Sequence, residues 1–289
     1  ASTPSALVSA LQGALDQGDF DAARKLADID DAPAELHFFF LDTVRECSVE
    51  STCRVSTAAA DAELIQQLAE QAKSLNAEPP KVEGVVAVDV KAKDGSGSGT
   101  MKMPYAKVGN GYKLVSIHFS PAQLAALRAK TNESLVAEFF AQGIRPSGST
   151  QPRIDWATAA AKLPADGGEP GKALVAQTRA MSAAVDAKDP DAAMSAGGQM
   201  ARIIFRDKDF KGNPIALAAR KSKLYVQSLR MLRDVNVSGG YQLGDDAVVI
   251  VEARNGIGWV VRGPILLSRE AGSWERAGDH TVSYPAASH

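Results

Sequence analysis

Two segments of the chain recur in the same order and at nearly the same spacing. Residues 15–23 read LDQGDFDAA and residues 185–193 read VDAKDPDAA, which share five identities at an offset of 170. Further along, YAKVGNGYKLVS at 105–116 aligns with LSREAGSWERAG at 267–278, and Tyr112 then lies opposite Trp274. Similar segments that keep their order and offset indicate a duplicated structural unit. We therefore expect two tandem domains with the same order of elements.

Each half opens with Ala-rich amphipathic helices and closes with apolar strands. Leu7, Leu11 and Leu15 recur at helical spacing and predict a helix over 5–17, which Gly18 ends. At the other end, Gly109-Asn110-Gly111 joins two strands in a tight turn, since Gly and Asn adopt positive φ readily. Helices first and an antiparallel sheet last predict an α+β fold, in which the N-terminal helices of each repeat pack on a curved sheet.

The segment between the two repeats is predicted to be a connection. Ser120-Pro121 is a good helix start, and we expect one helix over 120–142 with an apolar stripe. Residues 143–170 hold much of the Pro, Gly and Ser. The predicted domains are therefore 1–119 and 171–289, with a connecting helix and linker at 120–170. Within the first domain, a helix is predicted from Ser56 or Thr57 to Asn76.

Composition limits the function classes. Of the 289 residues, 45% are hydrophobic and 23% are charged, which is ordinary for a globular protein with room for two cores. The net charge of −2 argues against a nucleic-acid partner. The basic stretch at 219–233 has helical spacing and is interpreted as a solvated helix face. No apolar run approaches the ~20 residues of a membrane span.

The two cysteines and the first residues bear on where the protein acts. Cys47 and Cys53 form a close pair, which in an exported protein indicates a disulfide around a tight loop. Two free thiols, or a metal site with His37 nearby, are the alternatives. The start ASTPSALV has no initiator Met, as in a processed chain with an export signal or lipid anchor removed. A start chosen in cloning would look the same. We expect a periplasmic or extracellular protein, including a membrane-tethered lipoprotein.

The end of the chain carries a family resemblance. The pattern LLSREAGSWERAGDHTV resembles the last hairpin of the nuclear transport factor 2-like superfamily, where an aromatic strand closes a cone-shaped α+β barrel. YAKVGNGYKLVS is similar, so the resemblance covers most of the chain as two copies. The first copy departs from it in the Cys-containing loop, the extra helix at 120–142 and the DGSGSG break. The superfamily includes isomerases and dehydratases as well as non-enzymatic binding modules, so the resemblance leaves both open.

The sequence contains no catalytic, metal or nucleotide motif, and we expect no enzymatic activity, cofactor or metal. The alternative is an isomerase- or dehydratase-like enzyme with an acid–base pair inside one cone. Its candidate groups are Asp89, Tyr105, Tyr225, Tyr241, Asp246 and Glu252.

A binding or scaffold role in the cell envelope is the favoured hypothesis, with an envelope protein or a small apolar ligand as the partner. The oligomeric state is left open. The predicted protein-binding surface comprises Arg45, Arg54, Leu127 and Phe139. The predicted ligand pocket comprises Tyr105, Tyr225, Tyr241 and Trp259.

Overall fold

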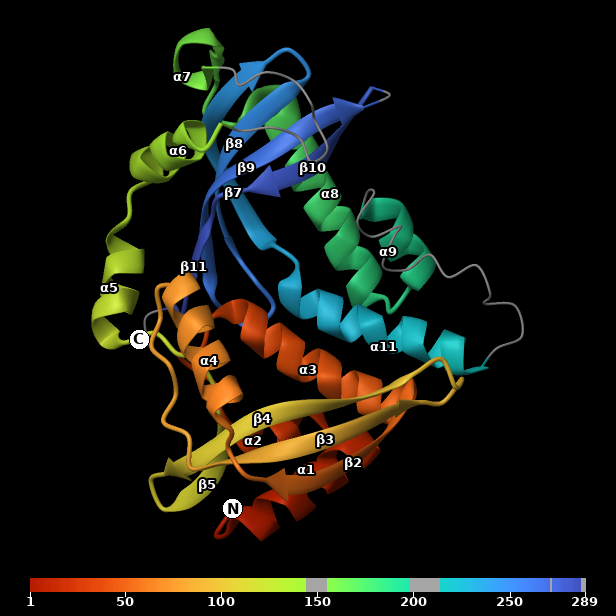
Figure 1. Cartoon of the computed structure of the whole chain (residues 1–289). Coiled ribbons are helices and arrows are strands. Elements are labelled where there is room, and N and C mark those ends of the chain that lie inside the picture. The colour runs from red at the N-terminus through yellow and green to blue at the C-terminus, as the bar shows by residue number, and fades with distance from the viewer. Residues whose placement is uncertain (144–154, 198–213, 271, 287–289) are drawn as a thin grey trace. The chain divides into compact units, whose positions relative to one another are not determined.

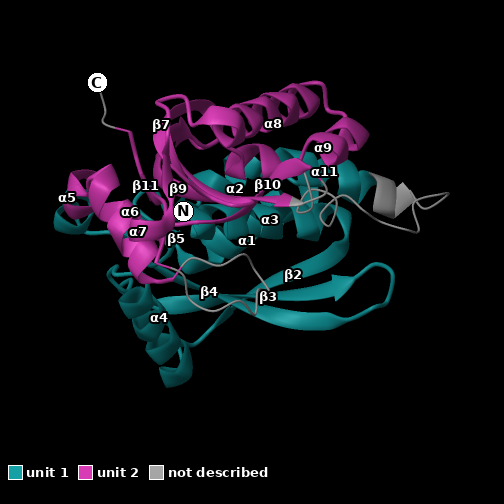
Figure 2. Ribbon diagram, turned by 90° about the horizontal axis from the view of Figure 1, so that it is seen from above, with its two compact units in different colours: residues 1–125, 209–226 teal, residues 126–208, 227–289 magenta. Residues whose placement is uncertain are grey.

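The computed structural model describes residues 1–143, 155–197, 214–270 and 272–286, and the chain divides into two compact units (Figure 2). Unit 1 comprises residues 1–125 and 209–226, and unit 2 comprises residues 126–208 and 227–289. The predicted boundaries at 119 and 170 differ from this division. A helix that crosses residue 125 is shared between the units, and residues 209–226 belong with the first sheet rather than the second.

Unit 1 contains four complete helices and five strands among its described residues. The helices are α1 (Pro4–Gln17), α2 (Phe20–Lys25), α3 (Ala34–Val49) and α4 (Ala62–Ser74), with parts of α5 (Pro121–Ala129) and α11 (Pro214–Arg230). The strands are β1 (Ala27–Asp28), β2 (Ser51–Ala58), β3 (Gly84–Ala92), β4 (Ser98–Val108) and β5 (Gly111–Val115). Their order in the sheet is β1-β5-β4-β3-β2, and every pair is antiparallel except β1 with β5.

The core of unit 1 follows from helical spacing in α1. Leu7, Leu11 and Leu15 are at most 1% exposed, because residues four apart lie on one face of a helix. That helix contacts α3, β2 and β5, and Val44 of α3 and Val85 of β3 are also fully buried. Gly18 ends α1 at φ 62, as predicted. The Gly109 turn between β4 and β5 is likewise confirmed.

The predicted disulfide is present. Cys47 in α3 is bonded to Cys53 in β2 at a Cα–Cα distance of 5.3 Å, and both residues are 5% exposed. The bridge ties the last turn of a helix to a strand, since α3 continues to Val49 and β2 begins at Ser51. The helix predicted from Ser56 or Thr57 to Asn76 is present as α4, but its predicted start is wrong: residues 51–58 pair with β3, and α4 begins after its N-cap, Asp61.

One side chain satisfies the free edge of β2. The Gln12 side-chain amide on α1 donates to the Cys53 carbonyl oxygen at 3.0 Å, and the Val55 backbone N–H donates to Gln12 Oε1 at 2.8 Å. An unpaired edge strand otherwise exposes such groups. The amide therefore holds α1 against the strand through two hydrogen bonds.

Unit 2 repeats the arrangement of helices followed by a sheet. The described helices are α6 (Asn132–Ala141), α7 (Trp156–Ala159), α8 (Gly168–Asp186) and α9 (Pro190–Ala196), together with the ends of α5 and α11. The strands are β6 (Ala161–Leu163), β7 (Arg233–Leu243), β8 (Asp246–Arg254), β9 (Val260–Glu270), β10 (Ser273–Asp279) and β11 (Val282–Tyr284). The order is β10-β9-β8-β7-β6, all antiparallel, and β11 pairs with β9 beyond β10.

The repeated sequence segments take the same local structure in both units. Asp19 caps α2 by accepting from the Ala22 N–H, and Asp189 caps α9 in the same way. The residue before each cap has positive φ, 62° at Gly18 and 55° at Lys188. Tyr112 and Trp274 are each the second residue of the closing strand of a hairpin. The two units are thus α+β repeats, as predicted.

Helices cover both faces of the second sheet. On one face, Leu174 of α8 packs with Val249, Ile265, Leu267 and Trp274. Alternate residues point to the other face, where Val248 and Leu266 pack against α6 and α7 (Figure 1). The α6 and α7 contacts come from Phe139 and Trp156, 8% and 3% exposed.

The single helix predicted over 120–142 is wrong. It is broken after Ala129, and Thr131 caps α6 by accepting from the Ser134 N–H at 3.1 Å. Ser120 nevertheless starts α5 as predicted, since its hydroxyl accepts from the Gln123 N–H. Breaking the helix allows the apolar stripe of α6 to turn onto the second sheet.

Arg262 on β9 fixes this break. Its side chain is 9% exposed and donates to Asn132 Oδ1 at 3.0 Å and to the carbonyl oxygens of Lys130 and Arg128 at 2.5 and 3.4 Å. A fourth bond reaches the Tyr284 hydroxyl on β11 at 3.3 Å. The carbonyls belong to the C-terminal end of α5, where the helix dipole favours a cation.

No helix among the described residues combines the length and apolarity that crossing a membrane requires.

Candidate functional site

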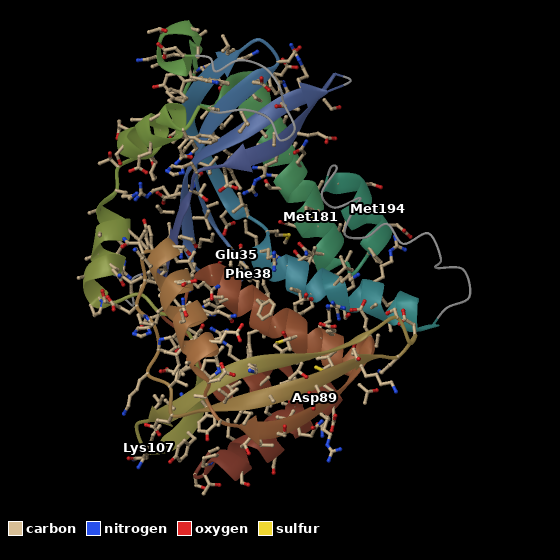
Figure 3. The ribbon with its side chains drawn as sticks, viewed as in Figure 1. Glu35, Phe38, Asp89, Lys107, Met181 and Met194 are labelled. Carbon is tan, nitrogen blue, oxygen red and sulfur yellow. A yellow bond between two sulfur atoms is a disulfide. The ribbon has the colours of Figure 1, made fainter. Side chains whose placement is uncertain are left out.

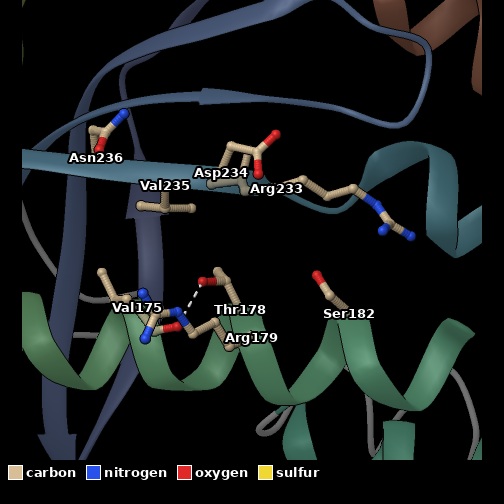
Figure 4. A pocket seen from close by; sticks show the side chains of 9 residues that line it. Val175, Thr178, Arg179, Ser182, Arg233, Asp234, Val235 and Asn236 are labelled. Carbon is tan, nitrogen blue, oxygen red and sulfur yellow. Dashed lines mark hydrogen bonds between the residues drawn. The ribbon is translucent and has the colours of Figure 1, made fainter.

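A groove of about 550 Å³ lies in unit 2 between α8 and the start of β7 (Figure 4). Helix α8 forms one wall, and the other is the segment that leads into β7. The lining residues are Val175, Thr178, Arg179 and Ser182 of α8, followed by Leu232, Arg233, Asp234, Val235 and Asn236.

The shape of the groove follows from helix spacing and a β-bulge. Val175, Arg179 and Ser182 are four and three residues apart, so they share one face of α8. On β7, Arg233 pairs with Arg254 and Asn236 pairs with Glu252, so one strand spans three residues where its neighbour spans two. The extra residue is a bulge, which bends a strand and redirects its side chains.

Backbone strain falls at the same place. Asp234 has a φ of 52°, in the left-handed region that non-Gly residues seldom adopt. Residues held in such conformations cluster at binding and catalytic sites. The positive φ of Asp234 beside the groove supports the choice of this site.

The surface that lines the groove is mostly polar, and its apolar part is small. Leu232 is 6% exposed and belongs to the core of unit 2, while Val175 and Val235 are half-buried. Figure 4 shows Val235 pointing toward α8, whereas the carboxylate of Asp234 and the amide of Asn236 point away from it. Apolar atoms therefore face the helix across the groove.

Some polar groups of the groove are already hydrogen-bonded or ion-paired within the protein, and others are not. The Thr178 hydroxyl donates to backbone carbonyls within its own helix, at 3.0 Å to Val175, and so has no proton left for a ligand. Arg233 Nη2 lies 3.1 Å from Asp186 Oδ1, and that ion pair neutralises its charge. The Ser182 hydroxyl faces β7 in Figure 4.

Arg179 is the exception. Its side chain is exposed at the groove and, within the described part of the chain, forms no ion pair or hydrogen bond. Figure 4 shows it lying along α8 on the side that faces β7. The groove thus combines a mostly polar lining with one positive charge that no described residue compensates.

The four aromatic residues predicted to line a pocket do not line this groove. Tyr105 and Tyr225 belong to unit 1, where Tyr105 packs over Gly84 and Tyr225, 42% exposed, stacks on Phe20 at 4.4 Å.

Tyr241 and Trp259 belong to unit 2 and have structural contacts there. Tyr241 lies edge-on to Phe140 with ring centroids 5.2 Å apart. Trp259 is 5% exposed, and its backbone N–H donates to the Asn255 side chain at 3.0 Å. The predicted aromatic pocket is therefore replaced by ordinary core packing.

Two of the four residues of the predicted protein-binding surface are buried. Arg45 is 5% exposed and lies 2.7 Å from both Asp42 and Glu50 carboxylates, which compensate its charge. Phe139 is buried under the second sheet, as described above. Of the other two predicted residues, Arg54 is exposed and Leu127 is half-buried.

The carboxylates considered for acid–base chemistry lie outside the groove. Asp89 on β3 is exposed and accepts from the Thr100 hydroxyl at 2.6 Å (Figure 3). Glu252 is exposed, and half-buried Asp246 accepts from the Ser268 hydroxyl at 2.5 Å. None of the three is buried in an apolar pocket.

One titratable group is buried in unit 1. His37 on α3 is 1% exposed, and its Nε2 lies 3.1 Å from the Ala32 carbonyl oxygen. Burial, together with the positive charge of Arg24, lowers the pKa of His37 to about 4. It is a neutral packing residue near pH 7. Within the described residues, no cluster of three or more His, Cys, Asp or Glu side chains could hold a metal ion.

Sequence reasoning named none of the groove residues. The signal in the sequence that could have indicated the groove is the helical spacing of Val175, Arg179 and Ser182, which places the three on one face of α8. The bulge that opens the strand opposite could not be read from the alternation of β7 alone.

Comparison with known proteins adds little. No family model matches the chain, and no curated protein matches it. Among solved structures, a cystatin-like protein from Ruminococcus gnavus aligns at 12% identity, over 96% of this chain and 83% of that chain, with a TM-score of 0.17. A similarity at that TM-score carries no argument about fold or function.

Proposed function

We propose that the protein is a non-catalytic binding protein of the cell envelope, and that it holds a small ligand in the groove between α8 and β7. The observation that carries this proposal is the groove itself, which has a volume of about 550 Å³ and a mostly polar lining with a small apolar part. Small-molecule sites have volumes of about 300–1,000 Å³, and the volume of this groove falls in that range.

The envelope location is supported by the disulfide between Cys47 and Cys53, because disulfides persist in oxidising compartments. A periplasmic or extracellular location, with or without a lipid tether, is part of the proposal. The resemblance to the nuclear transport factor 2-like superfamily is also part of the proposal. It is supported by the helices that pack on a sheet in each unit.

Non-catalytic binding is favoured over the isomerase or dehydratase alternative. Such an enzyme needs a carboxylate in an apolar pocket, where desolvation raises its pKa. The acidic residue that lines the groove is Asp234, which is exposed and points away from α8. The groove therefore offers no general base within reach of a bound ligand.

A protein partner is a second candidate, which a specific observation favours. The amphipathic helix α4 carries Ile65 and Leu75 at 49% and 41% exposure. Apolar side chains exposed on one helix suit a protein contact. In a pull-down from the native envelope, Ile65→Asp would then lose a partner that Gln66→Asp, altered on the neighbouring exposed residue, retains.

Native mass spectrometry of protein isolated gently from its own envelope tests the ligand proposal. A bound molecule of fixed mass is expected on the wild type. Ser182→Trp places a large ring in the groove and should remove it, whereas Ala183→Trp alters the adjacent exposed residue of α8 and should retain it. Equal occupancy of the two variants would show that the ligand binds elsewhere.

A further inference from the structure

We propose that β4 binds an extended segment of another protein along its free edge, so that the segment becomes an added strand of the first sheet. The site lies in unit 1 and does not depend on the groove between α8 and β7. The unpaired backbone of β4, its glycines and an adjacent apolar hollow carry the inference.

Strand β4 has a neighbour on both sides over only part of its length. Strand β3 pairs with residues 98–105 of β4, whereas β5 pairs only with residues 105–108. Residues 98–104 therefore have a strand on one side and none on the other, and Figure 1 shows β4 continuing past the end of β5. Such an edge exposes N–H and C=O groups to which another chain can bind.

Strand register identifies the groups that face the free edge. Successive residues of an edge strand direct their N–H and C=O groups alternately to the paired side and to the open side. The Ala92 N–H donates to the Gly97 carbonyl oxygen, so odd-numbered residues of this stretch bond to β3. The backbone groups of Ser98, Thr100 and Lys102 therefore face the open side, where they form no backbone hydrogen bond with another described residue.

The residues of this stretch allow another backbone to approach. A glycine within a strand often marks a place where another chain comes close, and Gly99 lies within β4. A Cβ added at Gly97 or Gly99 would meet no atom within 4 Å. Pro104, which has no N–H, belongs to the even-numbered series, so its pairing with β3 loses no donor. The charge of Lys102 is compensated by Asp61.

An apolar hollow of about 390 Å³ lies beside this edge. On one face of β3, Val86 and Val88 are fully buried, but Val90 and Ala92 further along the same face are half-buried. The last two and Met101 of β4 line the hollow, whose surface is mostly apolar. Because side chains alternate along a strand, every second residue of an added strand would lie on this face.

The hollow indicates which strand fits. A second copy of β4 would bring its own Gly99 to this face, and a glycine leaves the hollow unfilled. A foreign segment with apolar side chains at alternate positions would fill it, while its backbone bonded to Ser98, Thr100 and Lys102. Strand addition combines main-chain hydrogen bonds with pockets for alternate side chains in this way. The partner is therefore an extended, alternately apolar segment.

A labelled peptide of alternating threonine and valine tests the proposal by fluorescence anisotropy with the intact protein. The wild type should bind it, and should bind a peptide of alternating threonine and serine at least about tenfold more weakly, because the apolar side chains are gone. Two N-methylated forms test the backbone bonds, one methylated at every threonine and the other at every valine. In a paired strand only one of these sets of N–H groups faces β4, so one form should lose binding and the other should keep it. An equal effect of the two modifications, or no binding of the parent peptide, would overturn the proposal.

Thr100→Pro tests the same contact from the side of the protein. Proline removes the N–H that faces the open side and leaves the bonds to β3, so the far-UV circular dichroism should be unchanged and peptide binding should weaken about tenfold. Thr100→Val is the matched control. It also loses the side-chain hydrogen bond to Asp89 but keeps the N–H, and it should bind the peptide within about twofold of the wild type.

Two results would assign the effect of Thr100→Pro to another cause. Equal loss of binding in both variants would trace it to the side chain and contradict strand addition. A wild-type dimer in sedimentation that Thr100→Pro dissociates would give this edge to a second copy, and the proposed foreign partner would then be wrong.

Discussion

Replacing Arg262 with methionine should lower the free energy of unfolding of unit 2 by about 3 kcal/mol. The guanidinium group makes four hydrogen bonds at 9% exposure, to Asn132, Tyr284 and the carbonyls of Lys130 and Arg128. A bond from a charged donor contributes about 1.5–3 kcal/mol, and a buried acceptor left without one costs about 1–3 kcal/mol. The variant also no longer carries the cost of burying a charge, and this gain offsets part of the stability lost with the hydrogen bonds.

Unit 2 carries its own spectroscopic reporter. The chain has three tryptophans, and Trp156, Trp259 and Trp274 all belong to unit 2 at 3–5% exposure. Intrinsic tryptophan fluorescence in a urea titration therefore follows this unit. The midpoint should fall in the Arg262→Met variant while the slope stays the same, because the surface exposed on unfolding is nearly unchanged.

Arg254→Met is the matched control. Arg254 on β8 is exposed and donates to the Gly258 carbonyl at 3.3 Å. Its replacement should change the free energy of unfolding by less than about 0.5 kcal/mol. If Arg262→Met lowers the tryptophan transition by under about 1 kcal/mol, or no more than Arg254→Met does, then Arg262 does not hold the α5–α6 break and the reasoning is refuted.

Three other predictions concern the rest of the fold, each measured by far-UV circular dichroism in urea. Replacing both Cys47 and Cys53 with alanine should cost about 2 kcal/mol, because the bridge closes a short loop; no loss would contradict the chain-entropy argument. The folded pKa of His37, about 4, lies below the unfolded value of 6.5, so the unfolded chain takes up the proton first and stability falls as pH drops from 6.5 toward 4. The loss between pH 7 and pH 5 should be about 2 kcal/mol, and a His37→Gln variant that kept the same pH dependence would assign it to other groups. Asp19→Ala and Asp189→Ala should each cost about 1 kcal/mol, and clearly unequal losses would mean that the two caps are not equivalent.

The repeat and most helices could be predicted because their signals are local. The end of the first helix at Gly18, the turn at Gly109 and the start at Ser120 depend on a few neighbouring residues, and the structure confirms each.

Strand β2 was missed because its polar side chains concealed its alternation. Ser51, Cys53 and Val55 point inward, but Thr52, Arg54 and Ser56 alternate with them and one inward residue is itself polar. The segment was therefore interpreted as a loop followed by a helix. The break after Ala129 was missed for another reason: the apolar stripe runs on through it, and Arg262, which holds the break, is 130 positions from Asn132.

The candidate site could not be predicted because it depends on tertiary structure. The aromatic residues selected from the sequence are large and apolar, and such residues are used mainly for core packing. The groove instead arises where β7 gains one residue against β8, and no pattern near Asp234 in the sequence indicates that register shift.

The two hydrogen bonds from Gln12 have a consequence for assembly. The Gln12 amide turns one of its N–H groups and its oxygen toward β2 in the same relation as a peptide group. Cys53 and Val55 of β2 are therefore already bonded as if a further strand lay beside them. An incoming peptide, including β2 of a second copy, would have to displace α1 before it could pair with the backbone groups of this edge. Growth of the first sheet from this edge is therefore blocked in the folded protein, and the Gln12→Ala variant is where we would expect concentration-dependent aggregation to begin.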